Sequence, residues 1–439
     1  MASWSRIQRP ACYYYYSRRE AAMSVIKASS PSRPHSIQRL KTIFRSVTFI
    51  PTLKMRTATA LALLPLALAA PSRRATLAPV IKPRDVQLVD GKYIVKMKAN
   101  ANAASIQSSI QAIASDADFV YDHDGFKGFA SSLSAEEIQT LQSNNDVDYI
   151  EQDAVVSIKA TQNNAEWGLA RLSSQEAGST TYTYDDTAGE GTCAYIVDTG
   201  IEVDHPEFEG RAKWLANYAD NDDTDGNGHG THVSGTIGSK TYGVAKKTSL
   251  FGVKVLDAYG SGTNSGVIAG MDFVVTDAAK QTCPKGVVVN MSLGGGTSAA
   301  MNEAAASIVS AGLFLAVAAG NDATDAASFS PASEKTACTV GATTNTDAIA
   351  DYSNYGSVVD ILAPGTDIKS TWIGGATEVN SGTSMASPHI AGLGAYYLGL
   401  DASPVASLCD FIAKSALSGA ISGVPSGTVN LLANNGQSA

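Results

Sequence analysis

Apolar runs that resemble strands alternate with helix-like segments through residues 160–439 of this 439-residue chain. The clearest strand-like runs cover residues 193–197, 287–289 and 313–317. The clearest helix-like segments cover residues 266–279 and 301–310. Runs that are apolar throughout are typical of parallel strands buried on both faces. We therefore predict an α/β fold with a mostly parallel sheet and helices on both faces. Its functional residues should follow the carboxyl ends of the strands.

Three short segments rich in small residues each contain one side chain suited to acyl transfer. They read VDTG at 197–200, GHGTH at 228–232 and GTSMASP at 382–388. A serine hydroxyl is a weak nucleophile at neutral pH, so a nearby base has to take its proton. A histidine can be that base, and a carboxylate can fix its tautomer and stabilise the imidazolium. The order acid, histidine, serine is typical of one of three unrelated folds that share this triad, which predicts a serine hydrolase.

Each segment also has a purely structural interpretation. An isolated Asp-Thr-Gly is common, a histidine among glycines can lie in a turn, and Gly-Thr-Ser can begin a helix with the serine as its cap. The functional interpretation therefore rests on the conjunction of the segments. His232 lies three residues after His229 and thus on a neighbouring helical face. We interpret it as structural, together with His205 and His389.

Two metal-binding interpretations of the histidine region fail on their own patterns. The pair His229 and His232 lacks the glutamate of the His-Glu-x-x-His zinc motif. Residues 223–228 fit the opening of an EF-hand calcium loop, but the glutamate required at its twelfth position is replaced by Ser234. We interpret these acidic residues as a solvated loop leading to the histidine.

The net charge of −9 is unevenly distributed along the chain. Residues 1–54 carry a net charge of +9, residues 55–159 a net −2 and residues 160–439 a net −16. Phosphate binding requires clustered lysine and arginine, so the acidic C-terminal part argues against a nucleic-acid partner. Such a charge is compatible with a secreted, monomeric enzyme.

The N-terminal third predicts a leader and a small domain. Residues 57–70 form an uncharged, apolar run that is too short to span a bilayer and ends in a small-x-small site. We predict a signal peptide at 55–69 beginning at Met55, with no stable membrane anchor. A buried helix is the alternative. The basic extension at 1–54 has no evident role, although a targeting function is an alternative.

Residues 70–159 form the next predicted unit. Residues 92–98 alternate like a strand, and Ile106, Ile110 and Ile113 recur at helical spacing. A capping box begins a second helix at Ser134, and residues 149–153 complete a small α+β, ferredoxin-like domain.

Four of the five cysteines, Cys193, Cys283, Cys338 and Cys409, lie in the C-terminal part, and Cys12 lies in the extension. An even number beside an export signal predicts two disulfides, for which three pairings are possible.

The three motifs and their flanks resemble the subtilisin family, most closely its secreted proteinase K-like branch, which includes fungal cuticle-degrading proteases. The resemblance runs from about Trp167 to the C-terminus. It implies Asp198 as the orienting acid, His229 as the general base and Ser384 as the nucleophile. The segment AAGND at 318–322 resembles the family's oxyanion-hole motif. There Asn321 would donate to the oxyanion, and loss of such a donor costs about 10²–10³ in turnover, a figure known from subtilisin.

The resemblance also implies where substrate and calcium bind. Substrate would pair as an added strand with two backbone segments. The residues of these segments and of the pocket wall are Gly260, Ser261, Gly262, Ser292, Leu293, Gly294, Ala318 and Gly320. The small, uncharged wall suggests an apolar or aromatic P1 side chain and broad specificity. A structural calcium ion would bind the carboxylate of Asp360 and the carbonyls of Lys335 and Ala337.

The resemblance further implies the disulfides Cys193–Cys283 and Cys338–Cys409. Residues 70–159 would be an inhibitory, chaperone-like propeptide, and the peptidase domain at 160–439 would begin near Ala160.

Three functions compete on this sequence. The first is a secreted endopeptidase made as a zymogen, whose partners are peptide substrates and its own propeptide. The second is a catalytically dead binding protein, against which the intact motifs argue. The third is a dibasic-specific processing protease of the kexin kind, which would need acidic residues around the P1 pocket.

Overall fold

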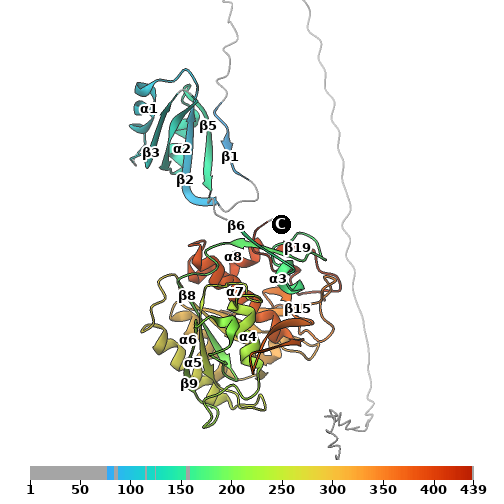
Figure 1. The fold of residues 1–439 in the computed structure, drawn as a ribbon. Helices are drawn as coiled ribbons and strands as arrows, with labels where there is room; N and C mark the ends of the chain where they lie inside the picture. The colour runs from blue at the N-terminus through green and yellow to red at the C-terminus, as the bar shows by residue number, and fades with distance from the viewer. Residues whose placement is uncertain (1–76, 84–87, 114–115, 124, 155–158, 438–439) are drawn as a thin grey trace, which may run out of the picture. The chain divides into compact units, whose positions relative to one another are not determined.

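The computed structural model describes residues 77–83, 88–113, 116–123, 125–154 and 159–437. The predicted leader at 55–69, the extension at 1–54 and Cys12 lie outside these residues. The described residues form a small domain ending at Ala154 and a larger domain beginning at Lys159, each with its own hydrophobic core (Figure 1).

The small domain is a five-stranded sheet in the order β1-β5-β2-β4-β3. Its elements are β1 (Val80–Ile81), β2 (Leu88–Met97), α1 (Ala103–Ile110), β3 (Phe119–His123), β4 (Phe126–Ser132), α2 (Ala135–Gln142) and β5 (Val147–Ala154). All neighbouring strands are antiparallel except β1 and β5. Both helices contribute to one core with the sheet, in which Ile106 and Leu141 contact strand residues such as Phe129. This is the α+β, ferredoxin-like arrangement that the sequence predicts.

The sequence predicts the start of the second helix of this domain correctly, but it predicts a first helix that is longer than the one observed. The hydroxyl of Ser134 accepts from the backbone N–H of Glu137, whose carboxylate accepts from the Ser134 N–H, which completes the capping box. The first helix instead ends at Ile110, so Ile113 packs against the core from the turn beyond it.

The larger domain is built on a nine-stranded sheet in the order β19-β20-β16-β15-β13-β11-β8-β10-β9. Its strands are β8 (Thr192–Asp198), β9 (Ala212–Asn217), β10 (Ser249–Lys254), β11 (Gly286–Met291), β13 (Phe314–Ala318), β15 (Cys338–Thr343), β16 (Ile361–Pro364), β19 (Leu417–Ser418) and β20 (Leu431–Leu432). Every pairing is parallel except that of β19 with β20.

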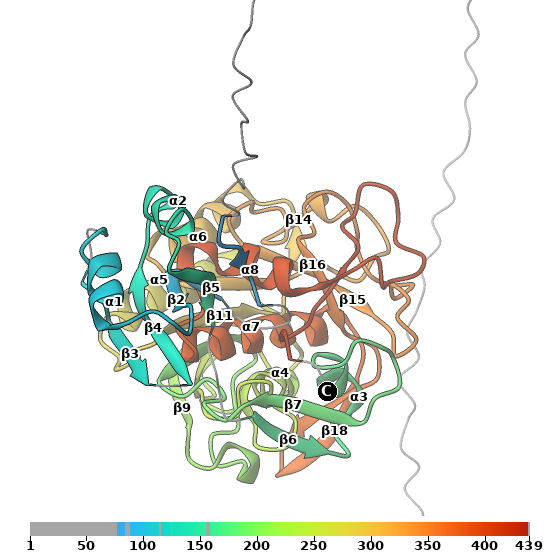
Figure 2. The same ribbon diagram turned by 90° about the horizontal axis from the view of Figure 1, so that it is seen from above.

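Helices cover both faces of this sheet, as predicted (Figures 1 and 2). One face packs against α4 (His229–Gly238) and α7 (Thr383–Gly399), and the other against α5 (Asn264–Ala278) and α6 (Ala299–Ser310). Nearly every residue of α7 is buried, as expected of a helix that is apolar on all sides. Among the helices of the described residues, none is long and apolar enough to cross a membrane.

Smaller elements surround this framework. They are α3 (Trp167–Arg171), α8 (Leu408–Ser415), the short helices η1 (Pro206–Phe208), η2 (Ala326–Ser328) and η3 (Val405–Ser407), and the antiparallel pairs β6 (Lys159–Asn163) with β7 (Thr181–Asp185), β12 (Gly295–Gly296) with β14 (Phe329–Ser330), and β17 (Ile368–Trp372) with β18 (Ala376–Asn380).

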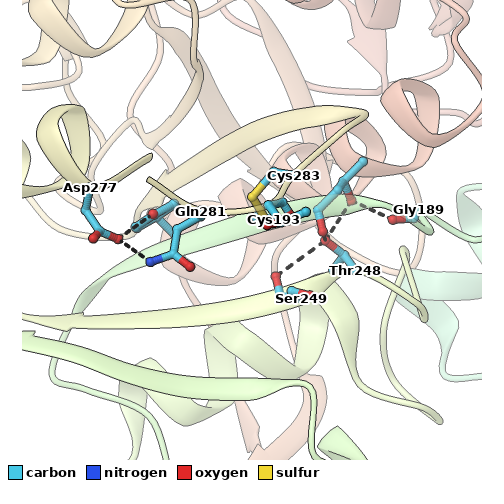
Figure 3. Close-up of a disulfide and its surroundings, with 10 residues drawn as sticks. Gly189, Cys193, Thr248, Ser249, Asp277, Gln281 and Cys283 are labelled. Carbon is cyan, nitrogen blue, oxygen red and sulfur yellow. Dashed lines mark hydrogen bonds between the residues drawn. A yellow bond between two sulfur atoms is a disulfide. The ribbon is translucent and has the colours of Figure 1, made fainter. Parts of the chain in front are cut away.

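Two disulfides join Cys193 to Cys283 and Cys338 to Cys409, the pairs that the resemblance implies. The first lies near the N-terminal end of the central strand β8 (Figure 3). In the same region the hydroxyls of Thr192 and Thr248 lie 2.7 Å apart, and nearby the carboxylate of Asp277 accepts from the Tyr195 hydroxyl. This end of β8 is therefore fixed covalently and by buried hydrogen bonds.

Replacement of both Cys193 and Cys283 by alanine should lower the unfolding temperature without changing the fold. The crosslink closes a loop of 90 residues, which corresponds to about 4 kcal/mol of unfolding free energy in the chain-entropy model. For a domain of this size that is roughly 10 °C in Tm. Calorimetry at one scan rate, with and without reductant, measures the shift. A variant whose Tm equals that of the oxidised parent would contradict the prediction.

Candidate active site

The strongest geometric feature of the site is the contact between Asp198 and His229. Asp198 is the last residue of β8 and is fully buried, and His229 is the first residue of α4. The Nδ1 atom of His229 lies 2.7 Å from Oδ1 of Asp198, which also accepts from the N–H of Thr199. Burial lowers the pKa of His229, but the Asp198 carboxylate raises it more, so the net pKa is raised. The ring is held in one orientation and remains 26% exposed.

The carboxylate of Asp225 holds this pair together and was not recognised in the sequence. We predicted a solvated loop at residues 223–228, but Asp225 is buried. Its oxygens accept from the Thr199 hydroxyl at 2.8 Å, from the Gly228 N–H at 2.8 Å and from both the N–H and the hydroxyl of Thr231. Asp225 therefore connects the turn after β8 to the first turn of α4. The signal that could have identified it is its position four residues before the histidine.

The beginning of α4 also approaches the turn after β8 very closely. The Gly230 N–H donates to the Thr199 hydroxyl at 2.9 Å. A Cβ atom at Gly230 would lie 2.1 Å from the carbonyl oxygen of Gly200, so only glycine fits there. This contact explains why small residues surround His229.

The histidines that we interpreted as structural are buried and bonded to backbone. Nε2 of His232 lies 3.0 Å from the carbonyl of Ile368 in β17, and Nδ1 of His389 lies 2.9 Å from that of Met385. Burial lowers the pKa of each to about 4, which keeps both neutral near pH 7. His205 is likewise buried, with Nε2 2.9 Å from the carbonyl of Ala376.

Ser384 is the second residue of α7. A proline later in that helix leaves the Ser384 carbonyl free to bond to a neighbouring segment. Pro388 has no N–H to donate to the carbonyl four residues earlier, which belongs to Ser384. That carbonyl instead accepts from the Ser292 hydroxyl at 2.7 Å. The helix with the candidate nucleophile is therefore bonded to the segment predicted to bind substrate.

The hydroxyl of Ser384 donates to the carbonyl of Ser292 at 3.1 Å. Within the described residues no hydrogen bond joins Ser384 to His229. Catalytic hydrogen bonds are often long before substrate binds, so the missing bond does not rule out a triad.

The amide of Asn321 is oriented by its neighbour in the serine motif. Asn321 is exposed and follows the end of β13 by three residues, after the strand as we expected. Its Oδ1 accepts from both the N–H and the hydroxyl of Thr383, at 2.8 and 2.9 Å. Because Oδ1 is occupied, the Nδ2 donor faces the remaining side, as an oxyanion hole needs.

The predicted substrate-binding residues lie partly at the surface. Ser292 and Ala318 are buried, Leu293 and Gly320 are half-buried, and Gly294 is exposed. Gly260, Ser261 and Gly262 are exposed as well, but they form a turn and an extended segment rather than the expected strand. The carboxylate of Asp257 accepts from the Ser261 N–H, which fixes this turn.

The predicted calcium ligand Asp360 is a mostly buried carboxylate without a cation beside it. Its Oδ2 accepts from the Thr339 N–H at 2.8 Å, and no ion pair reaches it within the described part of the chain. Burial raises the pKa of Asp360 to about 6. The sulfurs of Cys338 and Cys409 lie close to it but are bonded to each other, so they are not metal ligands. A desolvated carboxylate of this kind fits a bound cation.

Comparison with known protein families matches both domains. The model of the Subtilase family matches residues 189–422, and that of the peptidase inhibitor I9 matches residues 92–159. The first match covers every strand of the large sheet except β20, and all four candidate catalytic residues. The second covers most of the small α+β domain.

Individual relatives agree with these families. Proteinase T of Parengyodontium album is 70% identical over 291 residues, which are 66% of this chain and 99% of that protein. The cuticle-degrading protease of Metarhizium anisopliae is 54% identical over 382 residues, which are 86% of this chain and 98% of that protein. A crystal structure of a cold-adapted subtilisin-like serine proteinase superposes with a TM-score of 0.59 and 41% identity, over 62% of this chain and 99% of the other. The chain therefore belongs to the subtilase family, as a proteinase K-like serine protease with an I9 propeptide domain.

Proposed function

We propose that this protein is a secreted serine endopeptidase, synthesised as a zymogen, that cleaves peptide bonds through Ser384, His229 and Asp198. The observation that carries the proposal is the 2.7 Å contact between Asp198 and His229 at the end of the central strand. The helices bearing His229 and Ser384 share one core, and Ser384 follows the residue that orients Asn321.

The acylation step follows from the roles of these groups. The Oγ atom of Ser384 attacks the carbonyl carbon of the scissile bond while Nε2 of His229 takes its proton. The negative charge that develops on the carbonyl oxygen is stabilised by Nδ2 of Asn321 and the backbone N–H of Ser384, which points out of the first turn of α7. The buried Asp198 stabilises the imidazolium in this step.

The acyl-enzyme forms and is then hydrolysed. The tetrahedral intermediate collapses, the C–N bond breaks, and the leaving amine receives the proton from His229. A water molecule then attacks the ester carbonyl while His229 again acts as the base, and Ser384 leaves with the proton returned to it. Since the base must be neutral, activity should fall at low pH as His229 becomes protonated.

Synthesis as a zymogen is supported by the match to an inhibitory propeptide. The I9 match ends at Lys159, next to Ala160, where we infer that the mature enzyme begins. Secretion is supported by the predicted signal peptide and by the two disulfides, which persist in oxidising compartments.

Labelling with a fluorophosphonate should separate an active protease from a dead family member. In protein produced from Met55, we expect label on Ser384 and a new N-terminus near Ala160, both identified by mass spectrometry. The Ser384→Ala variant should show neither. A folded, processed protein that takes no label would refute the proposed activity and favour the binding protein.

The preference at P1 should separate this proposal from a kexin-like specificity. The wall residues Gly294, Ala318 and Gly320 carry no charge, and the carboxylate near Gly320 is that of Asp322. We expect kcat/KM for peptide anilides to be at least about tenfold higher with Phe or Leu at P1 than with Arg, because an uncharged pocket leaves a buried guanidinium without a partner. Faster cleavage after Arg would contradict the apolar pocket and implicate Asp322.

We further propose that a structural calcium ion binds Asp360 and the carbonyls of Lys335 and Ala337. The support is the desolvated carboxylate described above and the resemblance to the proteinase K-like branch. The ion would supply a counter-charge that the described protein residues do not, and it would stabilise the folded state because it binds that state alone.

Calcium should therefore raise Tm in a pH-dependent manner. Because the metal-free pKa of Asp360 is about 6, above its ordinary value, this carboxyl favours the metal-free folded state in acid and loses that contribution as pH rises through 6. The calcium-bound form needs the ionised carboxylate. We expect several degrees of difference between excess calcium and chelator near pH 8 and almost none at pH 5.

The Asp360→Asn variant should lose this calcium response at every pH. Asp410→Asn is a matched control, because it removes the neighbouring negative charge and leaves the proposed ligand in place. An unchanged response in Asp360→Asn would place the calcium elsewhere.

A further inference from the structure

We propose that Asn354 is a positioning residue for the oxyanion hole, and that it acts by holding the loop that carries Asn321. The proposal rests on the oxyanion role of Asn321 proposed above. Asn354 lies in the chain between β15 and β16, outside the four motifs of the family, and its side chain is fully buried.

The side-chain amide of Asn354 bonds to backbone on both sides of Asn321. Its Oδ1 accepts from the N–H groups of Asp322 and Thr324, at 3.0 and 3.1 Å, and its Nδ2 donates to the carbonyl of Ala319 at 2.9 Å. Its own backbone N–H donates to the carbonyl of Gly320 at 2.9 Å. One residue thus makes four hydrogen bonds to the segment that includes Asn321.

These bonds hold a backbone conformation that is unfavourable by itself. Ala323 has a φ of +53°, in the left-handed region that is unfavourable for a residue other than glycine. It lies between the two N–H groups that share Oδ1 of Asn354. Gly320 has a φ of +103°, and a Cβ atom there would lie 2.3 Å from Nδ2 of Asn354. Asn354 therefore supports the shape of this loop together with backbone bonds such as that from the Ala323 N–H to the Tyr352 carbonyl, and the loop closely surrounds its amide.

Two separate anchors consequently determine where the Asn321 donor points. Thr383 orients the side-chain amide through Oδ1 and accepts from the Gly320 N–H, and Asn354 bonds to the backbone on both sides of Asn321. An oxyanion donor is effective only when it is preorganised at the position where the charge develops. A displacement of about 1 Å can cost 10²-fold in rate. Since the side-chain bonds of Asn354 within the described residues all go to the loop, it acts through Asn321 and not on the substrate.

A double-mutant cycle tests this dependence. The Asn354→Ala change should lower kcat for a Phe-anilide peptide by about tenfold to a hundredfold, with KM changed less than about threefold. In an Asn321→Ala background the same change should lower kcat less than about threefold, because the donor that it positions is already absent. Asn354→Asp, which keeps the acceptor and loses the donor, should have an intermediate effect and serves if the alanine variant does not fold.

Asn435→Ala is the matched structural control. Asn435 is also a fully buried amide, whose Nδ2 donates to the carbonyl of Thr183 and whose Oδ1 accepts from the Gln437 N–H. It should lower Tm while leaving kcat within about twofold. Equal losses of kcat from Asn354→Ala in both backgrounds, or no loss in either, would overturn the proposal.

Amide hydrogen exchange gives a readout that does not depend on activity. The N–H groups of Asp322 and Thr324, which lose their acceptor, should exchange faster in Asn354→Ala than in the parent protein, and those of β8 should not. Unchanged protection of Asp322 and Thr324 would also overturn the proposal. A parent protein that hydrolyses no peptide would instead refute the proposed protease function, which keeps the two failures distinct.

Discussion

The carboxylate of Asp225 determines the geometry of the candidate catalytic pair. It accepts hydrogen bonds from the turn that follows β8 and from the first turn of α4, so the acid and the histidine cannot move independently. A buried carboxylate is stable only when hydrogen bonds compensate its lost hydration. The candidate site is therefore positioned by a buried group outside the candidate catalytic residues.

The same division between reacting and supporting groups recurs around the serine. Thr383 orients the amide of Asn321, Ser292 bonds to the carbonyl that Pro388 leaves free, and Asn354 holds the loop after β13. Each support bonds to backbone or to an amide, and each connects two segments that are distant in sequence. The reacting groups lie at strand or helix ends, where unpaired backbone N–H groups are available.

The sequence allowed the fold to be predicted and the candidate catalytic residues to be proposed, because both depend on local patterns. Fully apolar runs indicated parallel strands, and the motifs placed Asp198 at the end of β8 and Ser384 in the first turn of α7. Asp225 and Asn354 were missed because their importance lies in which backbone groups they meet, and a single sequence does not show such contacts. The substrate pairing expected at Gly260–Gly262 stays a prediction, and the N–H groups of Tyr259 and Ser261 both donate to the carboxylate of Asp257 in the turn there.

The proline in α7 has a wider meaning for how such a site can be assembled. A helix satisfies its own backbone so completely that it offers few points of attachment along its length. Because Pro388 has no N–H, the carbonyl of Ser384 lacks its intrahelical partner and is available to accept from the hydroxyl of Ser292 in the neighbouring segment. The helix with the candidate nucleophile and the segment proposed to bind substrate are thereby joined by a hydrogen bond that an uninterrupted helix could not offer. A single irregularity in the helix thus fixes these two parts of the site relative to each other.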